Sequence, residues 1–324
     1  MKATGGTNFA AITLAATALL AGSAAGQQYP TRPIHFIAPS GAGNATDLTL
    51  RIVAGKLTER RGWVTVVENK PGANYLIGTE TVLKAPADGH TALAAVSSLT
   101  VLPSTVKDLP YSLLRDLVPV TRLANLQQAF YASPSNPAKT LPELVAYAKA
   151  NPGKVNFATL GLGTFTHLAG ELVKQLTGTD MQVVPYKDMT GVSNVMNGSV
   201  SVGIAAVATV SSHIQAGRLR GLAVLSPQRS PLLPEVPAMG ETGLPAIDAD
   251  AWVGIMVNKG TPREIVATLN REISDIMRLP EVQAQFLKLG AAPVVESPEA
   301  FRKKIESDVA GWGKVIRDGK ITFD

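Results

Sequence analysis

Residues 34–47 read IHFIAPSGAGNATD, and residues 155–167 read VNFATLGLGTFTH. In each stretch an apolar run leads into a loop of small residues, and a helical pattern of apolar residues follows. In α/β folds this order places the loop at the carboxyl end of a strand and at the start of a helix. We therefore predict two α/β units whose loops face each other across a cleft.

The rest of the chain alternates short β-branched runs with amphipathic stretches, a pattern typical of α/β domains with mostly parallel sheets. Strands are predicted at residues 34–38, 63–68, 91–96, 155–158, 181–185, 200–205 and 219–225. Helices are predicted at residues 46–60, 77–84, 141–150, 164–176, 191–196, 262–277 and 298–316. Thr140, with Glu143 three residues on, fits the N-cap of one of these helices.

Composition excludes several classes of protein. With 324 residues, 45% hydrophobic and 17% charged, the chain is globular and long enough for two domains. The net charge of +5 is spread without a long block of like charges, and aromatic residues make up only 5%, so a nucleic-acid surface is not expected. The chain has no cysteine, which excludes disulfides and thiolate catalysis.

The first 26 residues have the features of a secretory signal peptide. Lys2 supplies the positive charge, residues 9–20 are apolar, and Ser23 and Ala25 fit the small-x-small cleavage rule. The apolar run is shorter than the ~20 residues that a membrane-spanning helix needs. We expect export to the periplasm, with cleavage after Ala25 or Gly26.

Catalytic motifs are not found. The four histidines form no HExxH pair, and no Gly-Lys-Ser/Thr phosphate loop is present. Thr166 stands where a dinucleotide loop needs its third glycine, and Ser40 lacks the spacing of a nucleophile elbow. We expect no metal, no cofactor and no enzymatic activity.

Helix amino ends at the two loops would present unpaired N–H groups and a partial positive charge, which suits a carboxylate. Other interpretations stay open. The loop before Asp47 fits a plain turn, and Asp47 itself fits a cap or structural acceptor better than a ligand contact. His167 fits internal packing as well as ligand binding, and Tyr186 and Lys187 fit a surface as well as a cleft.

The chain resembles the periplasmic solute-binding proteins of tripartite tricarboxylate transporters, often called Bug proteins. The resemblance runs along nearly the whole mature chain. Each motif alone is a weak signal, but the whole set in this order is highly specific for the family. The segments that carry it are YPTRPI (29–34), PSGAGNATD (39–47), ENKPGA (68–73), IG (77–78), APADGHT (85–91), ANPGK (150–154), GLGTFTHLAGE (161–171), VPYK (184–187), LPEVP (233–237) and GTP (260–262).

This resemblance implies a type II periplasmic-binding-protein fold, in which two α/β domains close on a ligand. It implies a discontinuous first domain, residues 27–126 and 249–324, and a second domain, residues 127–248. It further implies a small organic carboxylate as ligand, transporter membrane subunits as partners and a monomer that binds one ligand. The implied ligand-contacting residues are Ser40, Gly41, Ala42, Gly43, Asn44, Thr46, Asp47, Gly161, Gly163, Thr164, Phe165, Thr166, His167, Tyr186, Lys187 and Val207.

Departures from the family pattern narrow the ligand. They fall at Ser40, Asn44, Asn74, Tyr75, Asp188, Met189 and 205–207 (AAV). The last of these removes an aspartate that could pair with an ammonium group, and an unpaired amine in a closed cleft would cost affinity. We therefore expect a carboxylate without an amine and with an uncharged or apolar body. A periplasmic ligand sensor that signals to a partner protein is the alternative function, and an exported enzyme is a minor one.

Overall fold

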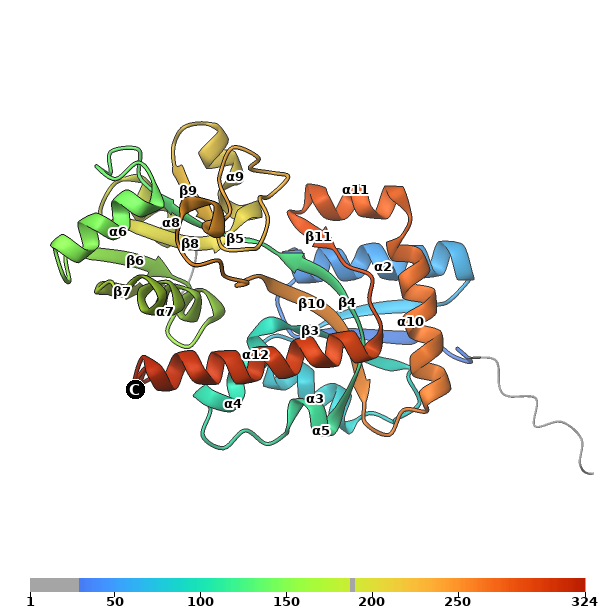
Figure 1. The fold of residues 1–324 in the computed structure, drawn as a ribbon. Coiled ribbons are helices and arrows are strands. Elements are labelled where there is room, and N and C mark those ends of the chain that lie inside the picture. The colour runs from blue at the N-terminus through green and yellow to red at the C-terminus, as the bar shows by residue number, and fades with distance from the viewer. Residues whose placement is uncertain (1–28, 187–189, 324) are drawn as a thin grey trace, which may run out of the picture.

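The computed structural model describes residues 29–186 and 190–323, which form two lobes, each built on one β-sheet (Figure 1). The predicted signal peptide, as well as Lys187, Asp188 and Met189, lies outside the described residues. Within them, no helix is long and apolar enough to cross a membrane.

The first lobe contains a six-stranded sheet in the order β11-β4-β10-β3-β1-β2. Strand β1 pairs in parallel with β2 and β3, whereas β10 runs antiparallel to β3 and β4. The short β11 is also antiparallel to β4. The strands are β1 (Ile34–Ala38), β2 (Thr65–Asn69), β3 (Thr91–Val96), β4 (Leu117–Leu126), β10 (Ala251–Asn258) and β11 (Ala291–Pro293).

The second lobe contains a five-stranded sheet in the order β7-β6-β8-β5-β9. Strand β6 is parallel to β7 and β8, and β5 is antiparallel to β8 and β9. The strands are β5 (Gln128–Ala132), β6 (Val155–Thr159), β7 (Met181–Pro185), β8 (Val202–Ala206) and β9 (Arg220–Val224).

The prediction of mostly parallel sheets was wrong, since both sheets are mixed. The antiparallel members include β4, β5 and β10, which the sequence patterns did not predict. These strands lead the chain from one lobe to the other. The direction of each strand in its sheet is therefore set by the path of the chain between the two sheets. The chain passes from the first sheet to the second at Gln127 and returns between Val224 and Ala251. The domain boundaries themselves stay a prediction.

Helices cover both faces of each sheet, so the strands alternate between two apolar layers. Phe36 of β1 packs in the layer under α2, α10 and α11, whereas Ile37 packs in the layer under α3 and α12. In the second lobe Phe130 faces α6 and α7, and Tyr131 faces α8 and α9. Burial on both faces explains why these strands are almost continuously apolar.

The predicted helices are confirmed, with ends that shift by at most two residues. Those around the first sheet are α2 (Ala45–Arg61), α3 (Leu76–Lys84), α4 (Leu102–Thr105), α5 (Leu113–Asp116), α10 (Arg263–Met277), α11 (Pro280–Lys288) and α12 (Pro298–Asp318). Those around the second are α6 (Leu141–Ala150), α7 (Phe165–Thr177), α8 (Thr190–Met196) and α9 (Val207–Gln215). Helices α4, α5, α9 and α11 were not predicted.

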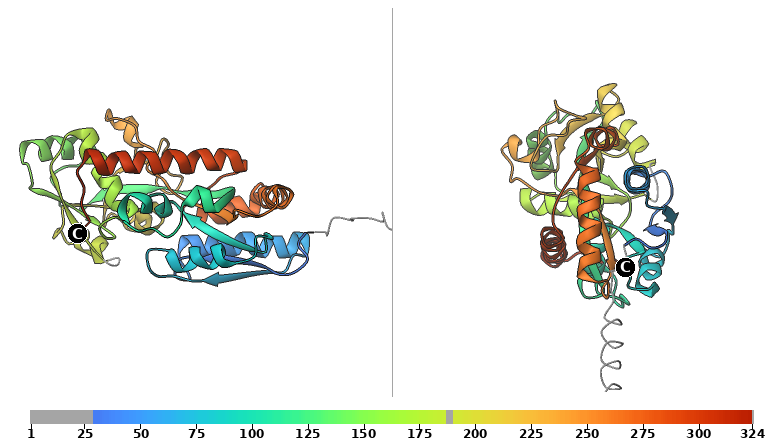
Figure 2. Two further views of the ribbon diagram at one scale, coloured as in Figure 1. Left: turned by 90° about the horizontal axis from the view of Figure 1, so that it is seen from below. Right: turned by 90° about the vertical axis from the view of Figure 1, so that its right-hand side faces the viewer.

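The long helix α12 runs along both lobes, as the views in Figures 1 and 2 agree. Near its start, Phe301 and Ile305 are buried against the first sheet. Near its end, Trp312 and Val315 belong to the core of the second lobe, where Trp312 meets the ring of Phe165 edge-on at 5.1 Å. The helix therefore braces the two lobes, and its carboxyl end lies beside α7.

Candidate functional site

The loop after β1 is held by side chains of the helix that it opens. Asn44 adopts an extended conformation and caps α2, because its Oδ1 accepts from the backbone N–H of Asp47 at 3.0 Å. The backbone N–H of Gly43, a residue with φ of +81°, donates to Oδ2 of Asp47 at 2.8 Å. The loop is thus closed on itself before any ligand is considered.

Asp47 is 2% exposed and its carboxylate is fully engaged. Besides the Gly43 N–H, it accepts from Arg51 Nε at 3.0 Å and from Asn69 Nδ2 at 2.9 Å. Burial raises the pKa of this carboxyl, but the hydrogen bonds from Arg51, Gly43 and Asn69 outweigh burial, and the pKa lies below its ordinary value. This arrangement fits the structural-acceptor interpretation of Asp47.

Asn69 at the end of β2 is a residue that the sequence patterns did not single out. Its Nδ2 also donates to the carbonyl oxygen of Ser40 at 3.1 Å, and its Oδ1 accepts from Arg51 at 2.9 Å. One amide therefore fastens the loop, the first turn of α2 and the neighbouring strand. The parallel pairing of β1 and β2, which ends at Ala38 and Asn69, was the signal that could have found it.

The loop after β6 repeats the same plan with other side chains. Thr164 caps α7, its Oγ1 accepting from the His167 N–H at 3.4 Å and donating to the Gly161 carbonyl at 2.7 Å. The N–H of Gly163 donates to Nδ1 of His167 at 3.0 Å. Thr166 is buried, and its hydroxyl lies 2.8 Å from that of Thr159.

His167 is 2% exposed, and its hydrogen bond from Gly163 requires an unprotonated Nδ1. Burial lowers the pKa of the imidazole, an effect that Glu171 opposes and Lys174 reinforces. The neutral ring is therefore the form that holds the loop. These contacts favour the interpretation in which His167 serves internal packing.

Two neighbouring cavities lie between the lobes. The first, which we name the inner chamber, has a volume of about 250 Å³ and is lined by both loops and by the strands that cross between the lobes. Its polar lining consists of Ser40, Asn44, Thr46, Tyr75, Ser97, Ser98, Gln128, Thr166 and Thr209. Its apolar lining consists of Val96, Leu126, Leu160, Phe165, Ala205, Ala206, Ala251 and Trp252.

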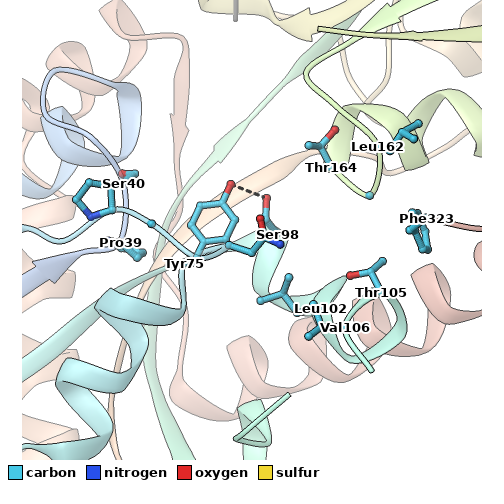
Figure 3. Close-up of a pocket in the computed structure, with 14 residues that line it drawn as sticks. Pro39, Ser40, Tyr75, Ser98, Leu102, Thr105, Val106, Leu162, Thr164 and Phe323 are labelled. Atoms are coloured by element: carbon cyan, nitrogen blue, oxygen red, sulfur yellow. Dashed lines mark hydrogen bonds between the residues drawn. The ribbon is translucent and has the colours of Figure 1, made fainter. Parts of the chain in front are cut away.

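The second cavity, which we name the outer chamber, has a volume of about 430 Å³ (Figure 3). It shares Ser40, Tyr75 and Ser98 with the inner chamber. The rest of its wall is Pro39, Pro71, Gly72, Asn74, Leu102, Thr105, Val106, Leu162, Gly163, Thr164 and Phe323. Among the described residues that line either chamber, none carries a charge.

The structure places the predicted residues in three groups. Seven line a chamber, namely Ser40, Asn44, Thr46, Gly163, Thr164, Phe165 and Thr166. Others support the loops from behind or lie within them, namely Gly41, Ala42, Gly43, Asp47, Gly161 and His167. Lys187 lies outside the described residues.

Tyr186 and Val207 form the third group. The hydroxyl of Tyr186 accepts from Asn194 at 3.1 Å, and its ring packs against α8. Val207 is fully buried in the core of the second lobe, and its neighbours Ala205 and Ala206 line the inner chamber in its place. Both side chains are thus engaged within the second lobe.

Ser97 and Ser98 line the inner chamber and were not predicted. They follow β3, which pairs in parallel with β1, so both strands end at the same edge of the sheet. That rule could have found them from the predicted strand at 91–96. Trp252 and Gln128 had no such signal, because they belong to unpredicted crossing strands.

A family model described as the tripartite tricarboxylate transporter family receptor matches residues 49–321. The chain is 37% identical to protein BugT of Bordetella pertussis over 306 residues, which cover 94% of each chain. It is 35% identical over 295 residues to a Pseudomonas protein from the tcbD-tcbE intergenic region, covering 90% of this chain and 88% of that one.

Solved structures agree with this result. A periplasmic transporter structure superposes with a TM-score of 0.78 at 32% identity, covering 91% of this chain and 100% of the other. The periplasmic binding protein BugD gives a TM-score of 0.75 at 28% identity, with 91% and 99% covered. Rpa4515 of R. palustris, solved with adipate, gives 0.79 at 28% identity, with 91% and 99% covered.

The similarity to these structures confirms the prediction of a two-lobed, type II periplasmic-binding-protein fold. The family match and the relatives extend over most of the chain. The alignment with BugT covers both loops of the candidate site, whereas the family match begins just after the first loop. By sequence and by fold, the chain belongs to the tripartite tricarboxylate transporter receptor family of periplasmic, solute-binding Bug proteins.

Proposed function

We propose that this receptor captures a small carboxylate that lacks an amine, by closing its lobes around the inner chamber. The observation that supports the proposal best is the convergence of two helix amino ends on a cavity whose described lining carries no charge. Residues from the first turns of both α2 and α7 line that cavity.

The donors for a carboxylate are backbone N–H groups and hydroxyls. In the described part of the chain, the N–H groups of Ala45 and Thr46 have no protein acceptor, and neither do those of Phe165 and Thr166. Such first-turn groups, with the partial positive charge of a helix amino end, stabilise an anion without a cationic side chain. The N–H groups of Gly43 and Gly163 are already used inside their loops and stay outside this set.

The neutral lining supports a ligand without an ammonium group. An amine enclosed in the inner chamber would meet hydroxyl and amide oxygens, such as those of Asn44 and Gln128, but no described carboxylate. Burying a charge without an opposite charge is costly. Leu160, Phe165 and Ala251 supply apolar surface for an uncharged ligand body.

We further propose that the loaded receptor delivers its ligand to the membrane subunits of a tripartite tricarboxylate-type transporter. The family match supports this partner, and the relative solved with adipate supports an organic acid as the cargo. Closure would bury the carboxylate and create the surface that the membrane subunits recognise.

The test is a thermal-shift screen of the mature chain, followed by calorimetry. We would screen succinate, adipate, benzoate and hexanoate against aspartate and glutamate at equal concentrations, since a ligand of the folded state alone raises the melting temperature. A shift with the non-amino acids and none with the amino acids is expected. Tight calorimetric binding of aspartate or glutamate would overturn the exclusion of amines, and no shift with any acid would overturn the proposed ligand class.

A further inference from the structure

The carboxyl-terminal segment of the chain returns to the candidate site. Helix α12 ends beside α7, where Nε2 of Gln175 donates to the carbonyl of Val315 at 2.7 Å. Lys320 then adopts a φ of +48°, and the N–H of Ile321 donates back to the last turns of α12 at 3.0 Å. After this turn both Ile321 and Phe323 pack against the core of the second lobe. Phe323 thus reaches the loop after β6 from a helix that begins on the first lobe.

Phe323 lies against both partners of the hydrogen bond that closes this loop. Its ring meets the ring of His167 edge-on, with centroids 6.1 Å apart. Gly163, whose N–H donates to Nδ1 of His167, has a φ of +70°, and a Cβ added there would lie 3.4 Å from Cδ1 of Phe323. A hydrogen bond that is shielded from water in this way is stronger than an exposed one.

The ring of Phe323 also lies where the two lobes approach each other. Figure 3 shows Phe323 with Leu162 and Thr105 at the end of the outer chamber away from Pro39. A Cβ added at Gly163 would lie 3.9 Å from Cγ2 of Thr105, which belongs to α4 of the first lobe. Phe323 therefore contacts the loop on the side that faces the other lobe.

This loop sets the direction of the first turn of α7. Thr164 caps the helix, and directly after it come the N–H groups of Phe165 and Thr166, which have no protein acceptor in the described part of the chain. They are among the donors that the proposed function assigns to the carboxylate. Because a hydrogen bond weakens steeply as its angle departs from linearity, a loop that shifts would misdirect these donors.

We propose that Phe323 is a positioning residue of the ligand site, which clamps loop 161–167 through Gly163 and His167 in the conformation that binds the carboxylate. The inference rests on the proposed function and adds to it a residue that lies far from both loops in sequence. Phe323 lines the outer chamber, but the effect assigned to it is transmitted by the loop. It is therefore independent of the length of the ligand.

The first experiment measures calorimetric affinities of mature Phe323→Ala, tagged at its amino end, for propionate and hexanoate. The apparent affinity falls with the fraction of protein whose loop is competent to bind. We expect a loss of about fivefold for both acids, which is within the range for losing an edge-on ring pair. Ile321→Ala is the matched control, because Ile321 packs against the same core but lines neither chamber. It should lose less than about twofold.

Two results would overturn the positioning role. A loss for hexanoate alone would mean that Phe323 touches the longer ligand directly. Equal losses in Phe323→Ala and Ile321→Ala would mean that weaker packing of the carboxyl-terminal segment, and not the clamp on the loop, lowers the affinity.

The second measurement needs no ligand. Burial lowers the pKa of His167, and Glu171 and Lys174 are the charged groups that act on its ring. Because Phe323 contacts that ring, we expect the pKa to rise towards its ordinary value in Phe323→Ala and to stay unchanged in Ile321→Ala. An NMR titration of the imidazole signals, assigned with His167→Asn, measures the pKa.

An unchanged pKa of His167 in Phe323→Ala would overturn the clamp while leaving the proposed function standing. Failure of every acid to bind the parent chain would overturn the proposed function instead. The pKa of His167 would then still decide whether Phe323 holds the loop, so the two failures are distinguishable.

A double-mutant cycle tests the route through His167. In a His167→Asn chain the ring that Phe323 contacts is gone, so adding Phe323→Ala should weaken hexanoate binding by less than about twofold. The same loss in both backgrounds would contradict the proposed route, because Phe323 would then act without His167.

Discussion

The backbone N–H of Gly163 donates to Nδ1 of His167, four residues on, at 3.0 Å. In the other lobe Gly43 donates in the same way to Oδ2 of Asp47, also four residues on, at 2.8 Å. Each lobe therefore closes its loop on the first turn of the following helix. The acceptor is a neutral imidazole in one lobe and a carboxylate in the other.

This equivalence predicts which substitutions His167 tolerates. His167→Phe fills the space but removes the acceptor, so the Gly163 N–H is left unpaired. We expect it to lower the free energy of unfolding by about 1–2 kcal/mol and to weaken carboxylate binding. His167→Asn carries an acceptor oxygen like that of Asp47 and should lose less in both measurements. Equal losses in urea unfolding would contradict the role of the Gly163 hydrogen bond.

The same hydrogen bond makes the second lobe sensitive to acid. Burial lowers the pKa of His167 below its ordinary value, about 6.5 in an unfolded chain. The unfolded chain then binds more protons, so the contribution of His167 to stability is complete above pH ~6.5 and is lost as the pH falls through the folded-state pKa. We expect the melting temperature to fall from pH 7 to 5, and to fall less in His167→Asn. The same slope in both proteins would assign the loss to other groups.

Asn69 is predicted to stabilise the first loop. Its side chain donates to Ser40 and Asp47 and accepts from Arg51. We expect Asn69→Ala to lower the free energy of unfolding by about 1–3 kcal/mol, because the buried carboxylate of Asp47 loses a donor. Asn69→Asp should cost more at neutral pH, since it sets two carboxylates against each other. A larger loss for alanine than for aspartate in urea unfolding would contradict this arrangement.

Asp250, directly before β10 where the chain returns to the first lobe, has the opposite pH dependence. Burial and the charge of Asp248 raise its pKa to about 7, against Lys304 and Arg122, which lower it. Its Oδ1 is buried and has no partner among the described residues. Because the folded-state pKa lies above the unfolded value, stability is lost as the pH rises from ~4 towards the folded-state pKa.

We therefore expect Asp250→Asn to raise the free energy of unfolding by at least about 1 kcal/mol at pH 8. The gain should be smaller at pH 5, where the folded protein holds the carboxyl protonated. Asp275→Asn is the control, because Asp275 is half exposed on α10, pairs with Arg61 at 3.0 Å and does not act on the pKa of Asp250. A gain from Asp250→Asn that is independent of pH would contradict the ionisation of this carboxyl.

The features that followed from sequence are those with local signals. Strands such as β1 and β6 stand out because a short apolar run meets a loop of small residues. Thr140 caps its helix, as its residue type and the Glu143 three residues on predict. Strands β4 and β10 gave no comparable signal, because each pairs with the other across more than a hundred residues of chain and no helix follows β4.

The candidate site was predictable in part for a related reason. The positions of both loops follow from sequence, because each lies between a predicted strand and a predicted helix, although the cap of the first helix is Asn44 and not Asp47. Asn69, Ser98 and Trp252, in contrast, reach the loops or the chambers only through sheet pairing. Tyr75 could not be placed at all. Left-handed conformations at Ala73, Asn74 and Tyr75 contradict local preference, and the packing of α3 against Pro39, which is distant in sequence, is one of the contacts that hold the turn.

The cap of α7 offers the sharpest test of where the carboxylate binds. Aspartate and asparagine are both good N-cap residues, so Thr164→Asp and Thr164→Asn should keep the helix and the melting temperature. Only the aspartate adds a negative charge at the amino end of α7, where Thr164 lines the outer chamber. At an effective dielectric constant of about 20, two like charges ~8 Å apart repel by about 2 kcal/mol, roughly a 30-fold loss of affinity. We expect calorimetry with hexanoate to show at least a tenfold loss for Thr164→Asp and less than a threefold loss for Thr164→Asn. Similar affinities for the two variants would place the carboxylate away from α7.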